Sequence, residues 1–196
     1  MDDVTVLALA AKGGDTVALS TFVTRTWDEV SRLVTAVAGR DLAEDATQDA
    51  YLRAIRALPS YRADASVRTW LLSIARRAAV DAVRGAARRR RLRDRLTARI
   101  EPRTTVDIDV DDLSLTEQML AHLDADRRTA FALTQILGLS YADAAAICGC
   151  PVGTIRSRVA RARDQLITVL GPEAVGARAS GAGPDAPREP PGGAMP

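Results

Sequence analysis

Aromatic side chains are scarce in this chain of 196 residues: they make up 4% of it, although 47% of the residues are hydrophobic. A β-sandwich core draws on aromatic and β-branched residues, whereas an alanine-rich chain favours helices. The sequence also lacks any run of about 18 apolar residues, the length of a membrane span. Its acidic start lacks the basic segment that opens a secretory signal. We therefore expect an all-α protein of the cytoplasm, without membrane insertion.

Side chains that hold metals or carry covalent chemistry are equally few. The two cysteines, Cys148 and Cys150, lie two positions apart in one turn, and His122 is the only histidine. Such a set does not supply the four ligands of a structural zinc site and cannot join two distant segments by a disulfide. The sequence shows no phosphate-binding loop and no nucleophile paired with a base. We expect a protein that is not an enzyme and that uses no metal or cofactor.

The charge of the chain is unevenly distributed, although it amounts to only +2. Residues 60–99 carry a net charge of +9, residues 100–126 a net charge of −7, and residues 127–170 a net charge of +4. Two basic blocks separated by an acidic block are typical of a protein that contacts a polyanion at two places.

Residues 140–166 predict two helices joined by a tight turn. Ser140 and Asp143 form a capping box at the start of the first helix. Gly149 suits the left-handed residue that ends a helix, and Pro151 cannot continue that helix. A second helix then follows, so the segment has the pattern of a helix-turn-helix.

On a helical wheel the second helix, expected over about residues 152–167, has two distinct faces. Its inward arc carries Ile155, Val159, Ala162 and Leu166. Its outward face and flanks carry the side chains expected to contact DNA, which are Thr154, Arg156, Ser157, Arg158, Ala160, Arg161 and Arg163. Small and polar groups suit base edges, and flanking arginines suit phosphates. A helical hairpin with a solvated basic face is the alternative interpretation of the same residues.

The rest of the chain predicts further helices. In the first half they cover residues 4–12, a segment from Asp15 to Gly39, residues 41–58, and a long segment that begins after Ser66. The buried stripe of the second is expected to comprise Leu19, Phe22, Val23, Trp27, Val30, Leu33, Val34 and Val37. Two shorter helices are expected over residues 113–138. The long helix carries the strongest basic surface, although its run of four arginines is by itself typical of a solvated helix end.

Three of these segments resemble the σ70 family of bacterial transcription initiation factors. PVGTIRSR at residues 151–158, followed by RAR at residues 161–163, resembles region 4, which binds the −35 promoter element. AEDATQDAYLRA at residues 43–54 resembles region 2.2, and SVRTWLLSIAR at residues 66–76 resembles regions 2.3 and 2.4. The resemblance covers roughly residues 5–92 and 113–168. Its compact two-domain form is similar to the extracytoplasmic-function (ECF, group IV) subfamily.

The resemblance implies roles for particular residues. On sequence grounds alone, the acidic start of the third helix only suits the helix dipole. The resemblance adds core polymerase binding by Asp45, Gln48 and Asp49. It also implies −10 contacts by Tyr61, Arg62, Arg68, Trp70, Arg76, Arg77 and Arg84. A loop with a tyrosine and an arginine has the chemistry to stack a flipped-out base and neutralise its phosphate. The family commonly has Asn where this chain has Arg77, so details of −10 reading are not carried over there.

The same resemblance implies the partners and the division of the chain. The partners are core RNA polymerase, through its β′ clamp helices and β flap, and promoter DNA; an anti-σ factor is a further partner that the resemblance allows and the sequence does not identify. We expect a σ2-like domain over residues 1–92, an acidic linker over 93–112, a σ4-like domain over 113–170, and a disordered tail over 171–196 that is rich in Gly, Ala and Pro.

Two other classes of protein compete with this interpretation. A stand-alone helix-turn-helix regulator explains residues 113–168, but it leaves the acidic face around Asp45 and the basic block at 60–91 without a role. A DNA-processing enzyme such as a recombinase requires a nucleophile constellation, which the sequence does not show.

Overall fold

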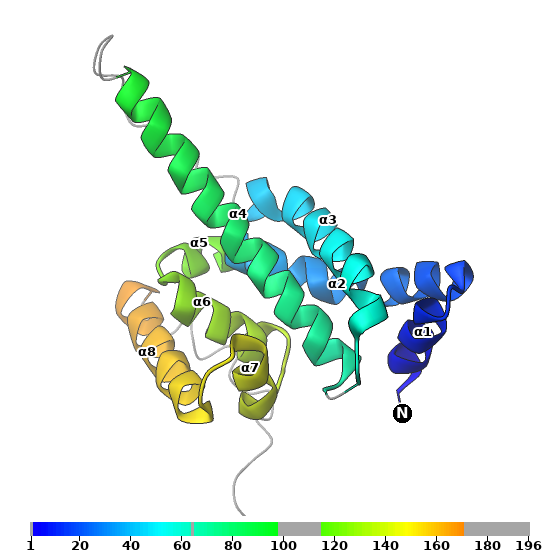
Figure 1. The fold of residues 1–196 in the computed structure, drawn as a ribbon. Coiled ribbons are helices and arrows are strands. Elements are labelled where there is room, and N and C mark those ends of the chain that lie inside the picture. The colour runs from blue at the N-terminus through cyan, green and yellow to red at the C-terminus, as the bar shows by residue number, and fades with distance from the viewer. Residues whose placement is uncertain (1, 64, 98–114, 171–196) are drawn as a thin grey trace, which may run out of the picture.

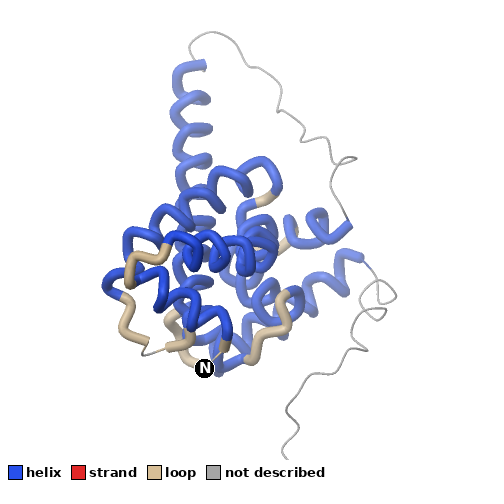
Figure 2. Tube along the Cα trace, turned by 90° about the vertical axis from the view of Figure 1, so that its right-hand side faces the viewer, coloured by secondary structure: helices blue, strands red, loops and turns tan. Residues whose placement is uncertain are grey.

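The computed structural model describes residues 2–63, 65–97 and 115–170. Within these ranges the regular structure is helical and no strand occurs (Figure 2). The first group of helices comprises α1 (Asp3–Lys12), α2 (Thr16–Ala38), α3 (Arg40–Ala57), the short 3-10 turn η1 (Leu58–Ser60) and α4 (Val67–Thr97). The second comprises α5 (Leu115–Ala121), α6 (Ala125–Phe131), the π-helical turn η3 (Ala132–Ile136), α7 (Tyr141–Cys148) and α8 (Val152–Leu170). The predicted all-α class is confirmed.

Local side chains set most of the helix ends, as the sequence predicts. The carboxylate of Asp15 accepts hydrogen bonds from the backbone N–H groups of Val17 and Ala18, both at 2.9 Å, and so caps the start of α2. The Ser66 hydroxyl accepts from the Thr69 N–H at 3.1 Å at the start of α4. Gly39, with φ of 82°, ends α2 in a conformation that costs other residues backbone strain. These local contacts fix the residues at which α2 and α4 begin and α2 ends.

The core of the first group lies where α2, α3 and α4 meet (Figure 1). The predicted stripe of α2 is largely confirmed, since Phe22, Val30, Leu33, Val34 and Val37 are buried. Trp27 departs from that prediction, because it is 39% exposed and stacks on Tyr51 with 5.4 Å between ring centroids. Tyr51 is buried and its hydroxyl lies 2.8 Å from that of Thr26, so an aromatic edge closes the core between α2 and α3.

The second group packs directly against the first. Helix α7 lies along α4, and α6 lies beside the C-terminal half of α2 (Figure 1). The guanidinium of Arg128 on α6 donates to the Val37 carbonyl at 3.3 Å, and Arg40 pairs with Glu117 at 3.2 Å. The buried residues of the two groups therefore form one continuous apolar cluster.

The predicted domain limits fall on different parts of this structure. Helix α4 continues through residue 92 to Thr97, so that limit lies inside a helix. Most of the acidic linker, the first two residues of the predicted σ4-like domain and the tail from residue 171 lie outside the described residues.

Candidate nucleic-acid and polymerase interfaces

Local hydrogen bonds and backbone conformation set both ends of α7 and the turn that leads into α8. Ser140 accepts a hydrogen bond from the Asp143 N–H at 3.1 Å, and its hydroxyl donates to the Asp143 carboxylate at 2.6 Å. Gly149 has φ of 65° and ψ of 40°, the left-handed conformation that the sequence predicts. The inward residues Ile155 and Leu166 are fully buried against the rest of the second group. The inner face of α8 thus packs on the core of the second group, and the outer face of α8 is left to solvent.

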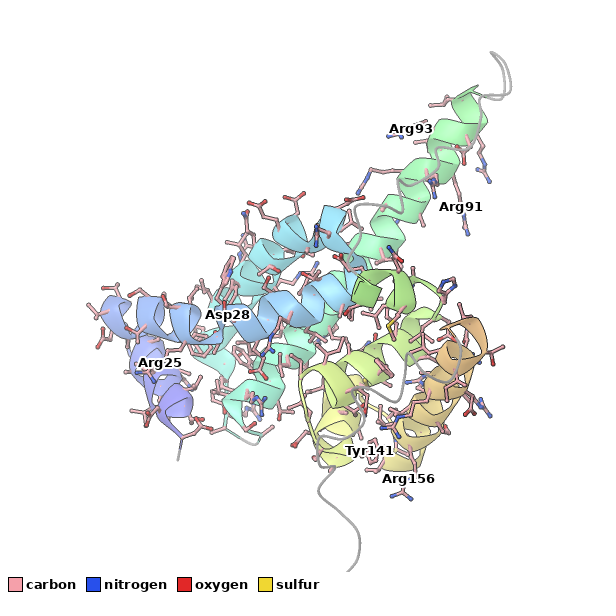
Figure 3. All side chains as sticks on the ribbon, turned by 180° about the vertical axis from the view of Figure 1, so that it is seen from behind. Arg25, Asp28, Arg91, Arg93, Tyr141 and Arg156 are labelled. Carbon is pink, nitrogen blue, oxygen red and sulfur yellow. The ribbon has the colours of Figure 1, made fainter. Side chains whose placement is uncertain are left out.

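The predicted DNA-contacting residues of α8 fall into two groups: some are accessible, and others are already bound to neighbouring helices. Ser157, Ala160, Arg156 and Arg161 are exposed, and Thr154 is half-buried at the start of the helix. Within the described ranges, the guanidinium groups of Arg156 and Arg161 have no hydrogen-bond or salt-bridge partner. Arg156 projects from the edge of the molecule into solvent (Figure 3). These two arginines are available to a ligand without breaking any existing contact.

The remaining two arginines of α8 are tethered to the neighbouring helices. Arg158 forms a short salt bridge with Asp126 of α6 and is half-buried. Arg163 donates to the side-chain carbonyl of Gln135 at 2.7 Å. A phosphate contact by either side chain has to replace a bond that already exists, so the four arginines are not equivalent.

The loop before α4 differs from the prediction at Tyr61. The Tyr61 side chain is buried, its hydroxyl donates to the Ala65 carbonyl at 2.7 Å, and its ring lies 5.1 Å from that of Trp70. In this arrangement the Tyr61 ring is part of the core, so stacking on a flipped-out base requires the loop to open first, and the −10 role of Tyr61 stays a prediction. Arg62 is exposed beside it, and Ala63 has a positive φ of 61°. The tyrosine supports the loop, while the arginine remains accessible.

The predicted −10 residues on α4 point in different directions. Arg68 is bound to Glu29 of α2, and this hydrogen bond raises the pKa of Arg68 above its ordinary value. Trp70 is half-buried against Tyr61. Arg77 is exposed and folds back onto the Ser73 carbonyl of its own helix at 3.1 Å. Arg84 is exposed as well.

Arg76 is the residue whose environment departs furthest from the prediction. Its guanidinium donates to the carbonyls of Ile147 and Cys148, both at 3.3 Å, at the C-terminal end of α7. A cation there satisfies carbonyl groups that have no partner within the helix and lies at the negative end of its dipole. In this arrangement Arg76 is half-buried and joins the two groups of helices.

The acidic face of α3 has the exposure that a partner surface requires. Asp45 and Gln48 are exposed, and Asp49 is half-exposed and paired with Arg53 at 2.6 Å. Leu52, one turn further along, leaves 53% of its surface in solvent. The face thus combines carboxylates with an apolar side chain, a composition that suits binding to a basic and partly apolar protein surface.

Three contacts within the fold have no counterpart in the sequence analysis. Lys12 Nζ donates to the Tyr61 carbonyl at 2.7 Å and so ties α1 to the loop before α4. Arg128 is half-buried, and burial lowers its pKa from the ordinary value. Arg76 completes the set. The partners of these residues lie between 5 and 91 positions away, so no local pattern signals most of them.

The described residues contain no group of three or more side chains able to hold a metal ion. Burial raises the pKa of the Cys148 thiol to about 11, so this thiol stays protonated near neutral pH. None of the helices in the described ranges is long and apolar enough to cross a bilayer.

These features define a helical protein whose helix-turn-helix and arginine-bearing helix are suited to nucleic acid. Comparison with known proteins gives the family. Residues 22–89 match the family model of σ70 region 2, and residues 113–166 match that of σ70 region 4. The ECF RNA polymerase sigma factor SigC of Mycobacterium tuberculosis is 47% identical over 175 residues, covering 87% of this chain and 92% of that protein. The ECF RNA polymerase sigma-E factor of Escherichia coli is 32% identical and covers 82% and 91%.

Two solved structures have the same fold. CnrH in complex with the cytosolic domain of CnrY superposes with a TM-score of 0.66 at 27% identity, covering 86% of this chain and 97% of that one. The sigma factor RpoE of Bartonella quintana, in complex with the anti-sigma factor NepR, gives a TM-score of 0.56 at 30% identity and covers 78% and 96%. The chain belongs to the ECF subfamily of the σ70 family and is an RNA polymerase σ factor for transcription initiation, a non-enzymatic role.

Proposed function

We propose that the acidic face of α3 is the surface that holds core RNA polymerase through its β′ clamp helices. The exposure of Asp45 and Gln48 within the segment that matches region 2 carries this assignment. The second group of helices, residues 113–170, then lies on the β flap and reads the −35 element. The first group, over residues 1–92, binds and melts the −10 element, with the acidic linker over 93–112 between them. This work takes place in the cytoplasm, where core polymerase and promoters meet.

We divide the proposed DNA contacts by whether each side chain is accessible or already bound to another residue. On α8 we propose Arg156, Ser157 and Arg161 as base-reading positions, because all three are exposed and neither arginine has a partner in the described residues; the Ser157 hydroxyl donates only to the Thr154 carbonyl of its own helix, at 3.0 Å. We propose Arg158 and Arg163 as phosphate contacts. On the −10 side we propose Arg62, Arg77 and Arg84 as accessible contacts. Tyr61 supports the loop, and a −10 contact by its ring requires the loop to open first.

An anti-σ factor is a proposed further partner. The solved relatives CnrH and RpoE are bound to CnrY and to the anti-sigma factor NepR, respectively. Their fold likeness and coverage of this chain support a similar regulatory partner here. Co-expression of this chain with small proteins encoded by neighbouring genes, followed by co-purification, tests whether it has an anti-σ partner.

The experiment that tests core binding reverses the charge of the α3 face. Asp45→Lys combined with Asp49→Lys abolishes capture of the full chain by core polymerase in the absence of DNA. The loss of the pair between Asp49 and Arg53 costs only about 0.5 kcal/mol, so the fold survives. The matched control is Asp28→Lys with Asp164→Lys, which changes the charge equally at exposed positions outside α3.

The same pull-down separates the two candidate classes. A stand-alone helix-turn-helix regulator does not bind core polymerase without DNA. Unchanged capture of the Asp45 and Asp49 variant would reject the α3 face, and failure of the wild-type chain to bind core would reject the polymerase role itself.

A further inference from the structure

The C-terminal part of α4 extends beyond the folded body of the protein. Residues 84–97, named here the arm, project away from both groups of helices (Figure 1). Every described side chain from residue 87 to residue 96 is exposed, including Leu92 at 60% and Leu96 at 64%. The match to the region 2 family model ends at residue 89, within the arm. A solvent-exposed helix of this length gains nothing from the core, so its composition reflects another requirement.

Four arginines of the arm lie on one face. Arg84, Arg88, Arg91 and Arg95 follow one another at intervals of four, three and four residues, which places them within an arc of about 60°. This stripe, named here the arginine stripe, lies on the side of α4 opposite the buried residues Leu71, Ala75 and Ala78. Arg91 of the stripe and Arg93 outside it lie on opposite sides of the arm (Figure 3).

The arginine stripe forms no ion pair within the described part of the chain, although Arg84 and Arg88 lie close enough to Asp81 to act on it electrostatically. None of its four guanidinium groups makes a hydrogen bond or a salt bridge there. The nearest acidic residue on the same face, Asp81, is already bound to Arg53 at 2.7 Å, and this bond holds the pKa of Asp81 below its ordinary value. Four adjacent like charges repel one another unless an anionic partner neutralises them.

The chemistry of the arm selects among anionic partners. The stripe extends for about 17 Å along a straight helix, a length that corresponds to about five phosphates of one strand measured along the axis of a DNA duplex. Single-stranded nucleic acid is instead held by aromatic side chains on which bases stack. Residues 71–97 contain no aromatic side chain, so the arm offers phosphate contacts without a stacking platform.

We propose that the arginine stripe of the α4 arm, Arg84, Arg88, Arg91 and Arg95, binds the sugar-phosphate backbone of double-stranded DNA without reading its sequence. Arg77 lies on the same face two turns earlier, so the stripe continues the accessible −10 surface towards duplex DNA. Arginine forms paired hydrogen bonds with phosphate oxygens, which suits this role. The identification of this duplex with promoter DNA beside the −10 element rests on the proposed function, whereas duplex binding by the stripe does not.

The test measures how salt weakens the binding of the full chain to DNA. The probes are a fluorescent duplex of about 30 base pairs with arbitrary sequence and one of its single strands, titrated between about 50 and 200 mM salt. The stripe variant combines Arg88→Gln, Arg91→Gln and Arg95→Gln. The control variant combines Arg89→Gln, Arg90→Gln and Arg93→Gln, which removes the same charge from the same helix on its other faces.

In the stripe variant the negative slope of log K against log salt on duplex DNA becomes shallower by about 2.7, at about 0.9 for each phosphate that the variant no longer neutralises. The control variant changes the slope by less than about 1. Equal losses in the two variants, or no loss in the stripe variant, would overturn the proposal. If the salt slope on single-stranded DNA changes as much as that on duplex DNA, the stripe does not select double-stranded DNA and the proposed partner is wrong.

Glutamine and arginine have similar helix propensities, so the arm remains helical, and circular dichroism of each variant checks this. If either triple variant loses helix, the single changes Arg91→Gln and Arg90→Gln repeat the comparison, with an expected slope change of about 0.9 for the first only. Core polymerase capture is unaffected by all these variants, which separates this proposal from the role of α3.

Discussion

The contact of Arg76 with α7 gives the sharpest structural prediction. Its guanidinium donates two hydrogen bonds, each of 3.3 Å, to the Ile147 and Cys148 carbonyls. Hydrogen bonds from a charged donor contribute about 1.5–3 kcal/mol each, and those at the long end of the distance range contribute less. Taking about 1 kcal/mol for each, Arg76→Met weakens the packing of α7 on α4 by about 2 kcal/mol. Methionine retains the apolar stem, so the change removes the bonds without opening a large cavity.

A loss of about 2 kcal/mol shifts the equilibrium between the packed and separated groups by about thirtyfold. Hydrogen exchange followed by mass spectrometry detects this shift as faster exchange in α7 and in the facing part of α4. Arg77→Met is the matched control, since the neighbouring guanidinium binds only within its own helix. If the two variants exchange alike, then Arg76 does not hold the two groups of helices together.

The same contact decides what Arg76 is able to do on DNA. One guanidinium cannot bind the carbonyls at the end of α7 and a phosphate at the same time. A −10 role for Arg76 therefore requires α7 to leave α4, whereas Arg77 and Arg84 are accessible in the packed arrangement.

Three further predictions concern single side chains. Arg161→Ala relaxes base preference at one or two −35 positions by about 1–3 kcal/mol, whereas Arg163→Ala lowers binding to a panel of single-base −35 variants nearly uniformly; the reverse pattern would mean that α8 is rotated in the groove. Lys12→Met removes the bond to the Tyr61 carbonyl, so trypsin cleaves the loop before α4 faster, and Lys12→Arg partly restores resistance. Burial raises the pKa of Tyr51 from 10.0 to about 12, so its contribution to stability is complete below pH 10 and is lost as the pH rises towards 12; Tyr51→Phe makes the thermal midpoint less sensitive to pH in that window, and an unchanged alkaline profile would contradict the assignment.

The helices were predictable because their ends are set by local signals. Asp15, Ser66 and Ser140 accept hydrogen bonds from backbone N–H groups two or three residues ahead, and Gly149 takes the left-handed conformation at the end of α7. Each signal lies within a few residues of the boundary that it sets. The faces of α8 follow from periodicity alone, and Ile155 is buried as the wheel requires.

The burial of the Tyr61 side chain was not predictable from local signals of this kind. A tyrosine beside an arginine in a loop has the chemistry of a base-stacking site, and nothing near it in the sequence indicates burial. Its surroundings combine a local and two more distant contacts: its hydroxyl donates to the Ala65 carbonyl four residues on, its ring packs on Trp70 of α4, and Lys12 of α1 binds its backbone carbonyl. The error at Trp27 has the opposite cause, since a helical stripe predicts burial while the ring lies at the exposed edge of the core.

The arginines show most clearly how structure adds to sequence. On the wheel, Arg156, Arg158, Arg161 and Arg163 are all candidates for DNA, and the identity of the residue does not separate them. The structure does, because Asp126 and Gln135 already hold Arg158 and Arg163, whereas Arg156 and Arg161 have no such partner in the described part of the chain. A tethered arginine gives up part of its existing interaction, about 1 kcal/mol, before it gains a phosphate. Base reading therefore falls to the unengaged pair, which can adopt the paired geometry that guanine requires without that cost.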